Sequence, residues 1–119
     1  MNTSGERSAQ QWLADIVAWG ERIAKYLDGK SEADFANDTL VQDAVLRCIE
    51  CIGEASRQIM KHGYAEQFPE MKFVQAYWTR NRIAHGYYDI SIERIWVTAT
   101  EAVPEFVLNA RRAIDESRL

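Results

Sequence analysis

The stretch DTLVQDAVLRCIECIGEASRQIMKHG, residues 38–63, decides the fold, because its apolar residues recur at the three- and four-residue spacing of one helical face. Asp38 is a favourable N-cap residue, and Gly63 lies where a helix running to about His62 would end. The apolar stripe of this helix is predicted to consist of Val41, Ala44, Val45, Cys48, Ile52, Ala55 and Ile59. Gly53 in the helix interior costs about 1 kcal/mol relative to alanine, so we expect another backbone to approach closely there.

The same period upstream predicts a first helix from about Ser8 to Leu27. Ser8 and Gln11 have the spacing of a capping box, and Gly29 follows the last periodic residue, where helices commonly stop. The segment from Ser31 to Phe35 has the pattern of a short capped turn that places its phenylalanine on the core.

Downstream, the pattern predicts a third long helix over residues 72–85, with Gly86 where that helix would end. Asp89 or Ser91 can cap a fourth helix, and Pro104 would kink that helix or begin a fifth piece. Four or five helices joined by short connections predict an all-α fold, an antiparallel up-and-down bundle.

The length of 119 residues suits one domain over residues 1–119, of which we expect residues 1–7 to be flexible. The formal net charge of −4 argues against a protein that coats nucleic acid with a broad basic face. Any contact with nucleic acid must therefore be local.

The two cysteines, Cys48 and Cys51, lie inside the predicted central helix, without the strand, loop and helix start of a redox motif. We expect both to be reduced and partly buried. The N-terminal residues lack the pattern of a signal sequence, and no stretch reaches the ~20 apolar residues of a membrane span. These features predict a cytoplasmic protein without membrane contact.

The end of the predicted third helix carries side chains that are suited to phosphate chemistry. The segment RNRIAHGYY, residues 80–88, reads Arg-x-x-x-x-His-x-Tyr and contains Arg80, Asn81, Arg82, His85, Tyr87 and Tyr88. A guanidinium stays charged and presents a donor fork that fits phosphate oxygens, while histidine titrates near neutrality and can exchange a proton.

The position of these residues on a helix limits how they can act together. Residues five apart are separated by about 140° around a helix, so Arg80 and His85 would not share a face, whereas Asn81 and His85 would. Fraying at Gly86, the reach of the arginine stem, or a second copy of the motif across a two-fold axis could bring them together. We favour the second copy, in a homodimer with a composite site.

Such a cluster suits cleavage of RNA without a metal or other cofactor. An imidazole would take the proton of a ribose 2′-hydroxyl, the oxygen would attack the adjacent phosphorus, and arginine would neutralise the crowded oxygens. The product would be a 2′,3′-cyclic phosphate, and single-stranded RNA is the expected substrate. Glu54, Arg82 and Tyr88 are candidates for supporting roles, although Glu54 could equally be an exposed or cap-pairing carboxylate.

Other interpretations of the motif remain open. Histidine at a helix end can simply cap carbonyl groups, and a pattern this short also arises by chance. A di-metal site is the weaker rival, because His62 and His85 are the two histidines and neither follows a glutamate by three residues. A non-catalytic helical module that binds a nucleotide or a partner protein, and a structural dimer scaffold, are the alternatives to an enzyme.

A longer set of motifs resembles the HEPN superfamily, specifically its HepT-like branch. The likeness runs from about Trp19 to Phe106 and is carried by residues 43–56, 68–73, 80–88 and 95–96. It implies a helical bundle that dimerises, with the Arg-x-x-x-x-His motifs meeting at the interface as a metal-independent ribonuclease site. Residues 71–73, Met-Lys-Phe, replace a more typical proline and tryptophan stretch, which bears on helix entry more than on chemistry.

The same resemblance implies the role of each motif residue. Arg80 and His85 take the catalytic positions, Asn81 takes the adjacent polar position, and Tyr88 is a packing or stacking residue. Tyr87 falls on the tyrosine that a minimal nucleotidyltransferase of the MNT type AMPylates in characterised relatives. The resemblance therefore implies a toxin that is silenced by an MNT-type antitoxin partner.

Overall fold

The computed structural model describes residues 7–86 and 90–117, and the described residues form helices joined by short connections. The helices are α1 (Ala9–Leu27), α2 (Glu32–Ala36), α3 (Thr39–Lys61), the 3₁₀ helix η1 (Ala65–Gln67), α4 (Phe73–Ala84), α5 (Ile92–Val97), the π-helix η2 (Thr98–Ala102) and α6 (Val103–Ser117). The predicted all-α bundle is confirmed.

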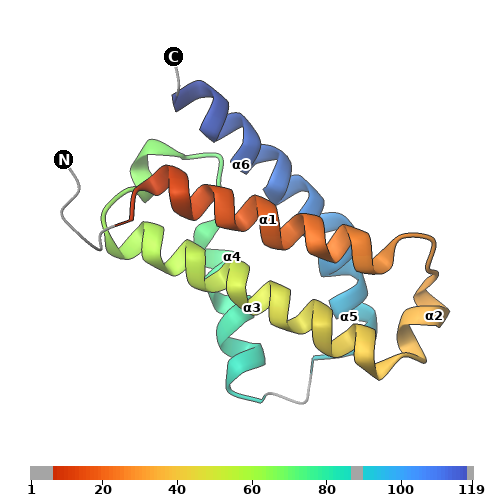
Figure 1. Cartoon of the computed structure of the whole chain (residues 1–119). Coiled ribbons are helices and arrows are strands. Elements are labelled where there is room, and N and C mark those ends of the chain that lie inside the picture. The colour runs from red at the N-terminus through yellow and green to blue at the C-terminus, as the bar shows by residue number, and fades with distance from the viewer. Residues whose placement is uncertain (1–6, 87–89, 118–119) are drawn as a thin grey trace.

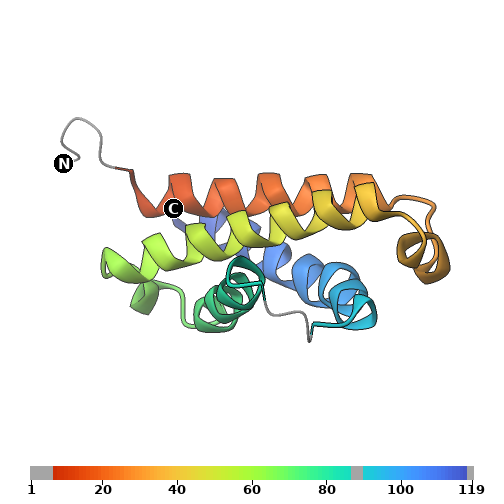
Figure 2. The same ribbon diagram turned by 90° about the horizontal axis from the view of Figure 1, so that it is seen from below.

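Helix α3 is the centre of the bundle (Figure 1), and it packs against both α1 and α4. Helices α1 and α3 lie side by side and run in opposite directions, and α6 runs back along α1. Helix α4 lies across α3 rather than alongside it, so that Figure 2 shows it nearly end-on beneath the long helices. This crossing places the C-terminal end of α4 at an edge of the bundle.

The helix starts follow the predicted caps. Ser8 Oγ accepts a hydrogen bond from the Gln11 backbone N–H at 3.2 Å, and Gln11 Oε1 accepts one from the Ser8 N–H at 2.7 Å. Asp38 Oδ1 caps α3 by accepting from the Val41 N–H at 3.2 Å. Phe35, on the short capped helix α2, is fully buried, as predicted.

Helices α3 and α4 end in the same way. Their C-cap residues, His62 and His85, have the same backbone conformation (φ −89°, ψ 6°), and each is followed by a glycine with positive φ. The glycines have φ of 78° at Gly63 and 66° at Gly86, a region that favours glycine over other residues. The predicted helix ends are therefore confirmed at both places.

The C-terminal third of the chain is more continuous than predicted. Ser91 caps α5, whereas Asp89, the alternative cap, lies outside the described residues. The π-helix η2 then joins α5 to α6, and Pro104 is the second residue of α6. Because proline cannot donate an intrahelical hydrogen bond, the wider turn before it lets the chain continue as a helix.

Both cysteines are free thiols on α3, as predicted, with Cys48 buried and Cys51 half-buried. Burial raises the pKa of each thiol above its ordinary value, so both are protonated at neutral pH. Among the described residues, no helix is both long enough and apolar enough to cross a membrane.

The predicted close approach at Gly53 is also confirmed, and it involves α4. A Cβ atom at this position would lie 2.1 Å from Cβ of Arg80 and 2.8 Å from the backbone oxygen of Ala76. The absence of a side chain at Gly53 therefore allows α4 to cross α3 at the residue that begins the Arg-x-x-x-x-His motif.

Candidate active site at the end of helix α4

Arg80 is fixed at both ends of its side chain. Its stem packs on Gly53, and its guanidinium Nη1 donates a hydrogen bond to Oδ1 of Asn81 at 3.0 Å. Its Nη2 atom lies 3.6 Å from Oε2 of Glu54 on α3. The side chain remains 31% exposed, so the guanidinium is oriented by the protein and is also within reach of a ligand.

Glu54 is the centre of a small polar cluster on α3. Its Oε1 atom accepts hydrogen bonds from Arg57 at 3.2 Å and from Gln58 at 3.0 Å, while its Oε2 atom faces Arg80. Ion pairs as exposed as these contribute at most about 1 kcal/mol to stability. The main consequence is geometric, because the carboxylate directs the Arg80 guanidinium towards Asn81.

His85 is exposed at the end of α4, and its ring is oriented by the backbone. Its Nδ1 atom lies 2.7 Å from the backbone oxygen of Asn81. Since a carbonyl oxygen only accepts, the neutral ring carries its proton on Nδ1. In this tautomer Nε2 is the ring nitrogen that carries no proton.

Asn81 connects the two key side chains within one chain. Its side-chain oxygen holds Arg80, and its backbone oxygen holds His85. Arg80 and His85 leave the helix in directions about 140° apart, as predicted from their spacing. The arginine side chain is long, however, and its guanidinium reaches the side chain of Asn81. These contacts are within one chain, and the favoured route, a second copy of the motif across a two-fold axis, stays a prediction.

The remaining predicted site residues are placed less completely. Arg82 is half-buried on the last turn of α4 and is engaged in interactions there. Tyr87 and Tyr88 lie outside the described residues, so their predicted roles stay predictions. Gln58 was not predicted as part of the cluster, although its four-residue spacing from Glu54 could have indicated it.

A cavity of about 200 Å³ lies between α3, α4 and α6, and its lining includes Ile52, Ala76 and Phe106 but neither Arg80 nor His85. Within residues 7–86 and 90–117, no group of three or more His, Cys, Asp or Glu side chains is arranged to hold a metal ion.

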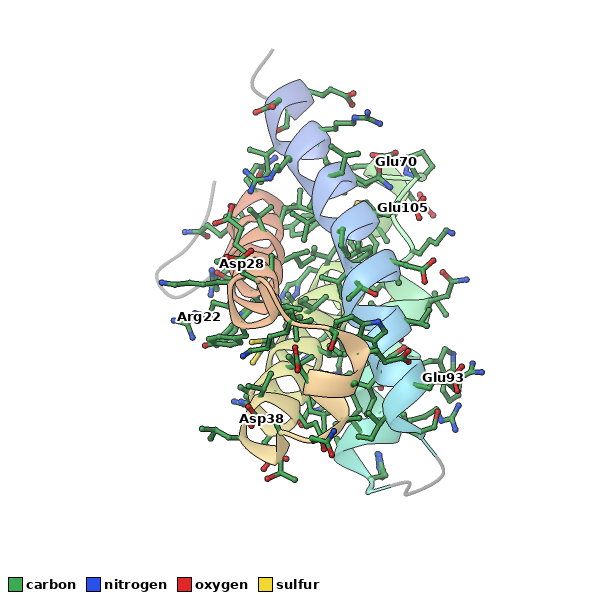
Figure 3. The ribbon with its side chains drawn as sticks, turned by 90° about the vertical axis from the view of Figure 1, so that its right-hand side faces the viewer. Arg22, Asp28, Asp38, Glu70, Glu93 and Glu105 are labelled. Atoms are coloured by element: carbon green, nitrogen blue, oxygen red, sulfur yellow. The ribbon has the colours of Figure 1, made fainter. Side chains whose placement is uncertain are left out.

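Glu54 is the acidic residue paired with Arg80, and other acidic side chains of the chain lie on other helices. Glu93 and Glu105, for example, are exposed on α5 and α6, and Figure 3 shows them along the side of the bundle formed by these helices. The local positive charge of Arg80 therefore occurs on a protein with a net charge of −4.

The described residues form an all-helical fold in which Asn81 contacts both the half-buried Arg80 and the exposed His85 at the C-terminal end of α4. The chain matches the model of the ribonuclease HepT-like family over residues 20–113 and belongs to that family. The family is a family of ribonucleases. The resemblance to the HepT-like branch that the sequence motifs indicated is confirmed.

Proteins with similar sequences have names that refer to ribonucleases. A protein of Thermococcus cleftensis named as a probable ribonuclease HepT is 30% identical over 99 residues, which covers 83% of this chain and 89% of that protein. A protein of Methanocaldococcus jannaschii named as a candidate RNase is 29% identical over 100 residues, or 84% of this chain and 85% of that protein. No solved structure is significantly similar to the chain.

Proposed function

We propose that this protein is a metal-independent endoribonuclease that cleaves single-stranded RNA. The observation that supports the proposal is the pair of contacts to Asn81, whose side-chain oxygen accepts a hydrogen bond from the charged Arg80 and whose backbone oxygen lies 2.7 Å from Nδ1 of His85. His85 Nε2 takes the proton of a ribose 2′-hydroxyl, and the resulting oxygen attacks the adjacent phosphorus. Arg80 neutralises the charge that builds up on the non-bridging oxygens.

The bond from phosphorus to the 5′-oxygen then breaks, and the leaving oxygen needs a proton. The products are a 2′,3′-cyclic phosphate and a 5′-hydroxyl. One imidazole cannot be base and acid at the same time, and His62, the other histidine, is at the end of α3. A second copy of the chain would supply the acid through its own His85, which supports a homodimer with a composite site.

The ribonuclease proposal is tested by incubating the purified, unmodified protein with single-stranded RNA in the presence of EDTA. We expect cleavage to proceed at the same rate as without the chelator. Loss of cleavage in EDTA would indicate metal chemistry, and binding without cleavage under both conditions would favour the non-catalytic module.

The HepT-like family context supports a role as the toxin of a toxin–antitoxin pair whose partner is an MNT-type nucleotidyltransferase. In this proposal the partner AMPylates Tyr87, two residues after His85. A nucleotide on this tyrosine would add bulk and negative charge to the motif segment, and both would disfavour binding of an RNA phosphate. The modification would therefore silence the enzyme.

We predict that coexpression with a nucleotidyltransferase encoded next to this protein increases its intact mass by one or more AMP groups. The Tyr87→Phe variant removes the acceptor hydroxyl and should keep its unmodified mass. Mass spectrometry of the intact proteins checks this result. An unchanged wild-type mass, or adducts that persist in Tyr87→Phe, would remove Tyr87 from the account.

A further inference from the structure

Trp78 is an exposed aromatic residue on the same helix as the site. It retains 62% of its accessible surface, and Val74, one turn earlier, retains 57%. Asn81 and His85 follow Trp78 by three and seven residues, so the three side chains lie on one face of α4. The ring of Trp78 is therefore a flat, solvent-facing surface beside the Arg–Asn–His cluster.

The other tryptophans of the chain have structural roles. Trp12 and Trp19 are partly buried and lie beneath the guanidinium groups of Arg7 and Arg22, at 4.2 Å and 4.6 Å from the ring centroids. Trp96 packs on the core, with its ring 5.6 Å from that of Phe35. Of the four tryptophans, Trp78 is the one that is exposed. Packing within the bundle does not explain why a tryptophan occupies this position.

We propose that Trp78 is a stacking platform for a base of the RNA strand whose phosphate lies at Arg80 and His85. The proposal rests on the proposed ribonuclease function and adds a contact that binds the substrate without taking part in the reaction. Seven residues of helix place Trp78 about 10 Å from His85 along the axis, which suits the base of a nearby nucleotide.

Charge and chemistry favour RNA as the occupant of this surface. Arg82 lies one turn beyond Trp78 on α4, and the Arg80 guanidinium reaches Asn81, three residues after Trp78, so positively charged side chains lie towards this face of the helix. A chain with a net charge of −4 gains little from long-range attraction to RNA, so short-range stacking has to supply more of the binding. Stacking accepts any base, and we therefore expect little preference for base identity at this position.

The test measures equilibrium binding of a 2′-O-methyl single-stranded RNA, which lacks the attacking hydroxyl and cannot be cleaved by the proposed reaction. We expect Trp78→Ala to weaken binding about ten-fold and Trp78→Phe, which keeps an aromatic ring, to bind nearly as well as the wild type. The salt dependence of binding should be the same in Trp78→Ala as in the wild type, because no charge is removed. Leu108→Ala, at a 48% exposed residue on α6, is the control and should bind like the wild type.

Two results would overturn the proposal. One is equal binding by wild type and Trp78→Ala. The other is loss of binding in Trp78→Ala that accompanies conversion of a dimer into a monomer in sedimentation velocity, which would make Trp78 a protein contact. The binding assay does not depend on cleavage, because the oligonucleotide is not cleaved. If Trp78 contributed to binding but the protein left natural RNA intact, the stacking proposal would be supported and the ribonuclease function would be contradicted.

Discussion

We expect replacement of His85 with alanine to lower kcat/KM for RNA cleavage by about 10²- to 10⁴-fold, the usual contribution of general acid–base catalysis. In the proposed mechanism, the ring takes the proton of the 2′-hydroxyl, and no other imidazole lies in the cluster formed by the described residues. The side chain is exposed, so its loss should change the free energy of unfolding by no more than about 1 kcal/mol. Cleavage rates and thermal unfolding of the same preparations check both parts.

His62→Ala is a closely matched control. His62 ends α3 with the same backbone dihedral angles as His85, and its Nδ1 atom lies 2.9 Å from the backbone oxygen of Gln58, four residues earlier. Both substitutions therefore remove a histidine from the same type of helix end. If His85 only capped its helix, the two variants would cleave RNA equally well, and the catalytic role would be lost.

Replacing Gly53 with alanine destabilises the fold and also impairs the site. The new Cβ atom would lie 2.1 Å from Cβ of Arg80 and 2.8 Å from the Ala76 oxygen, and neither atom can move without shifting α4. Overpacking of this kind costs about 1–3 kcal/mol, against which the better helix propensity of alanine offsets up to about 1 kcal/mol. Because a displacement of about 1 Å can cost 10²-fold in rate, we expect cleavage to fall at least ten-fold in the folded protein.

Gly20→Ala separates these two effects. A Cβ atom at Gly20 would lie 2.1 Å from Cγ2 of Val107, at the contact between α1 and α6 and away from Arg80. This variant should lose stability but keep the cleavage rate of its folded fraction, as measured at temperatures well below its Tm. Equal rates for Gly53→Ala and the wild type would show that the crossing of α3 and α4 does not position the site.

The helices and their ends could be predicted from the sequence because their signals are local. Ser8 with Gln11, Asp38, and the glycines after His62 and His85 act within one turn of the chain, and the structure has each of them in the predicted role. The steep crossing of α4 over α3 could not be predicted in the same way. It depends on a tertiary contact, although Gly53 did indicate where that contact occurs.

The residues of the candidate site could be named from the sequence, but the arrangement of their side chains could not be predicted. The prediction from helical spacing placed Arg80 and His85 on different faces, because it assumed that each side chain points straight out from the helix axis. The side-chain conformation that brings Arg80 to Asn81 depends on Glu54 and on the space left by Gly53, both on another helix. Trp78 was not predicted as a site residue, since an aromatic residue in a helix is usually part of the core.

The most direct test of the central claim, that Arg80 and His85 act on one phosphate through the 2′-hydroxyl, is the chemistry of the cleaved ends. The wild-type protein is incubated with a defined single-stranded RNA in EDTA, and the fragments are identified by mass spectrometry. The account predicts fragments that end in a 2′,3′-cyclic phosphate and begin with a 5′-hydroxyl. Fragments with 3′-hydroxyl and 5′-phosphate ends would contradict it, because water and not the ribose would then have attacked the phosphorus.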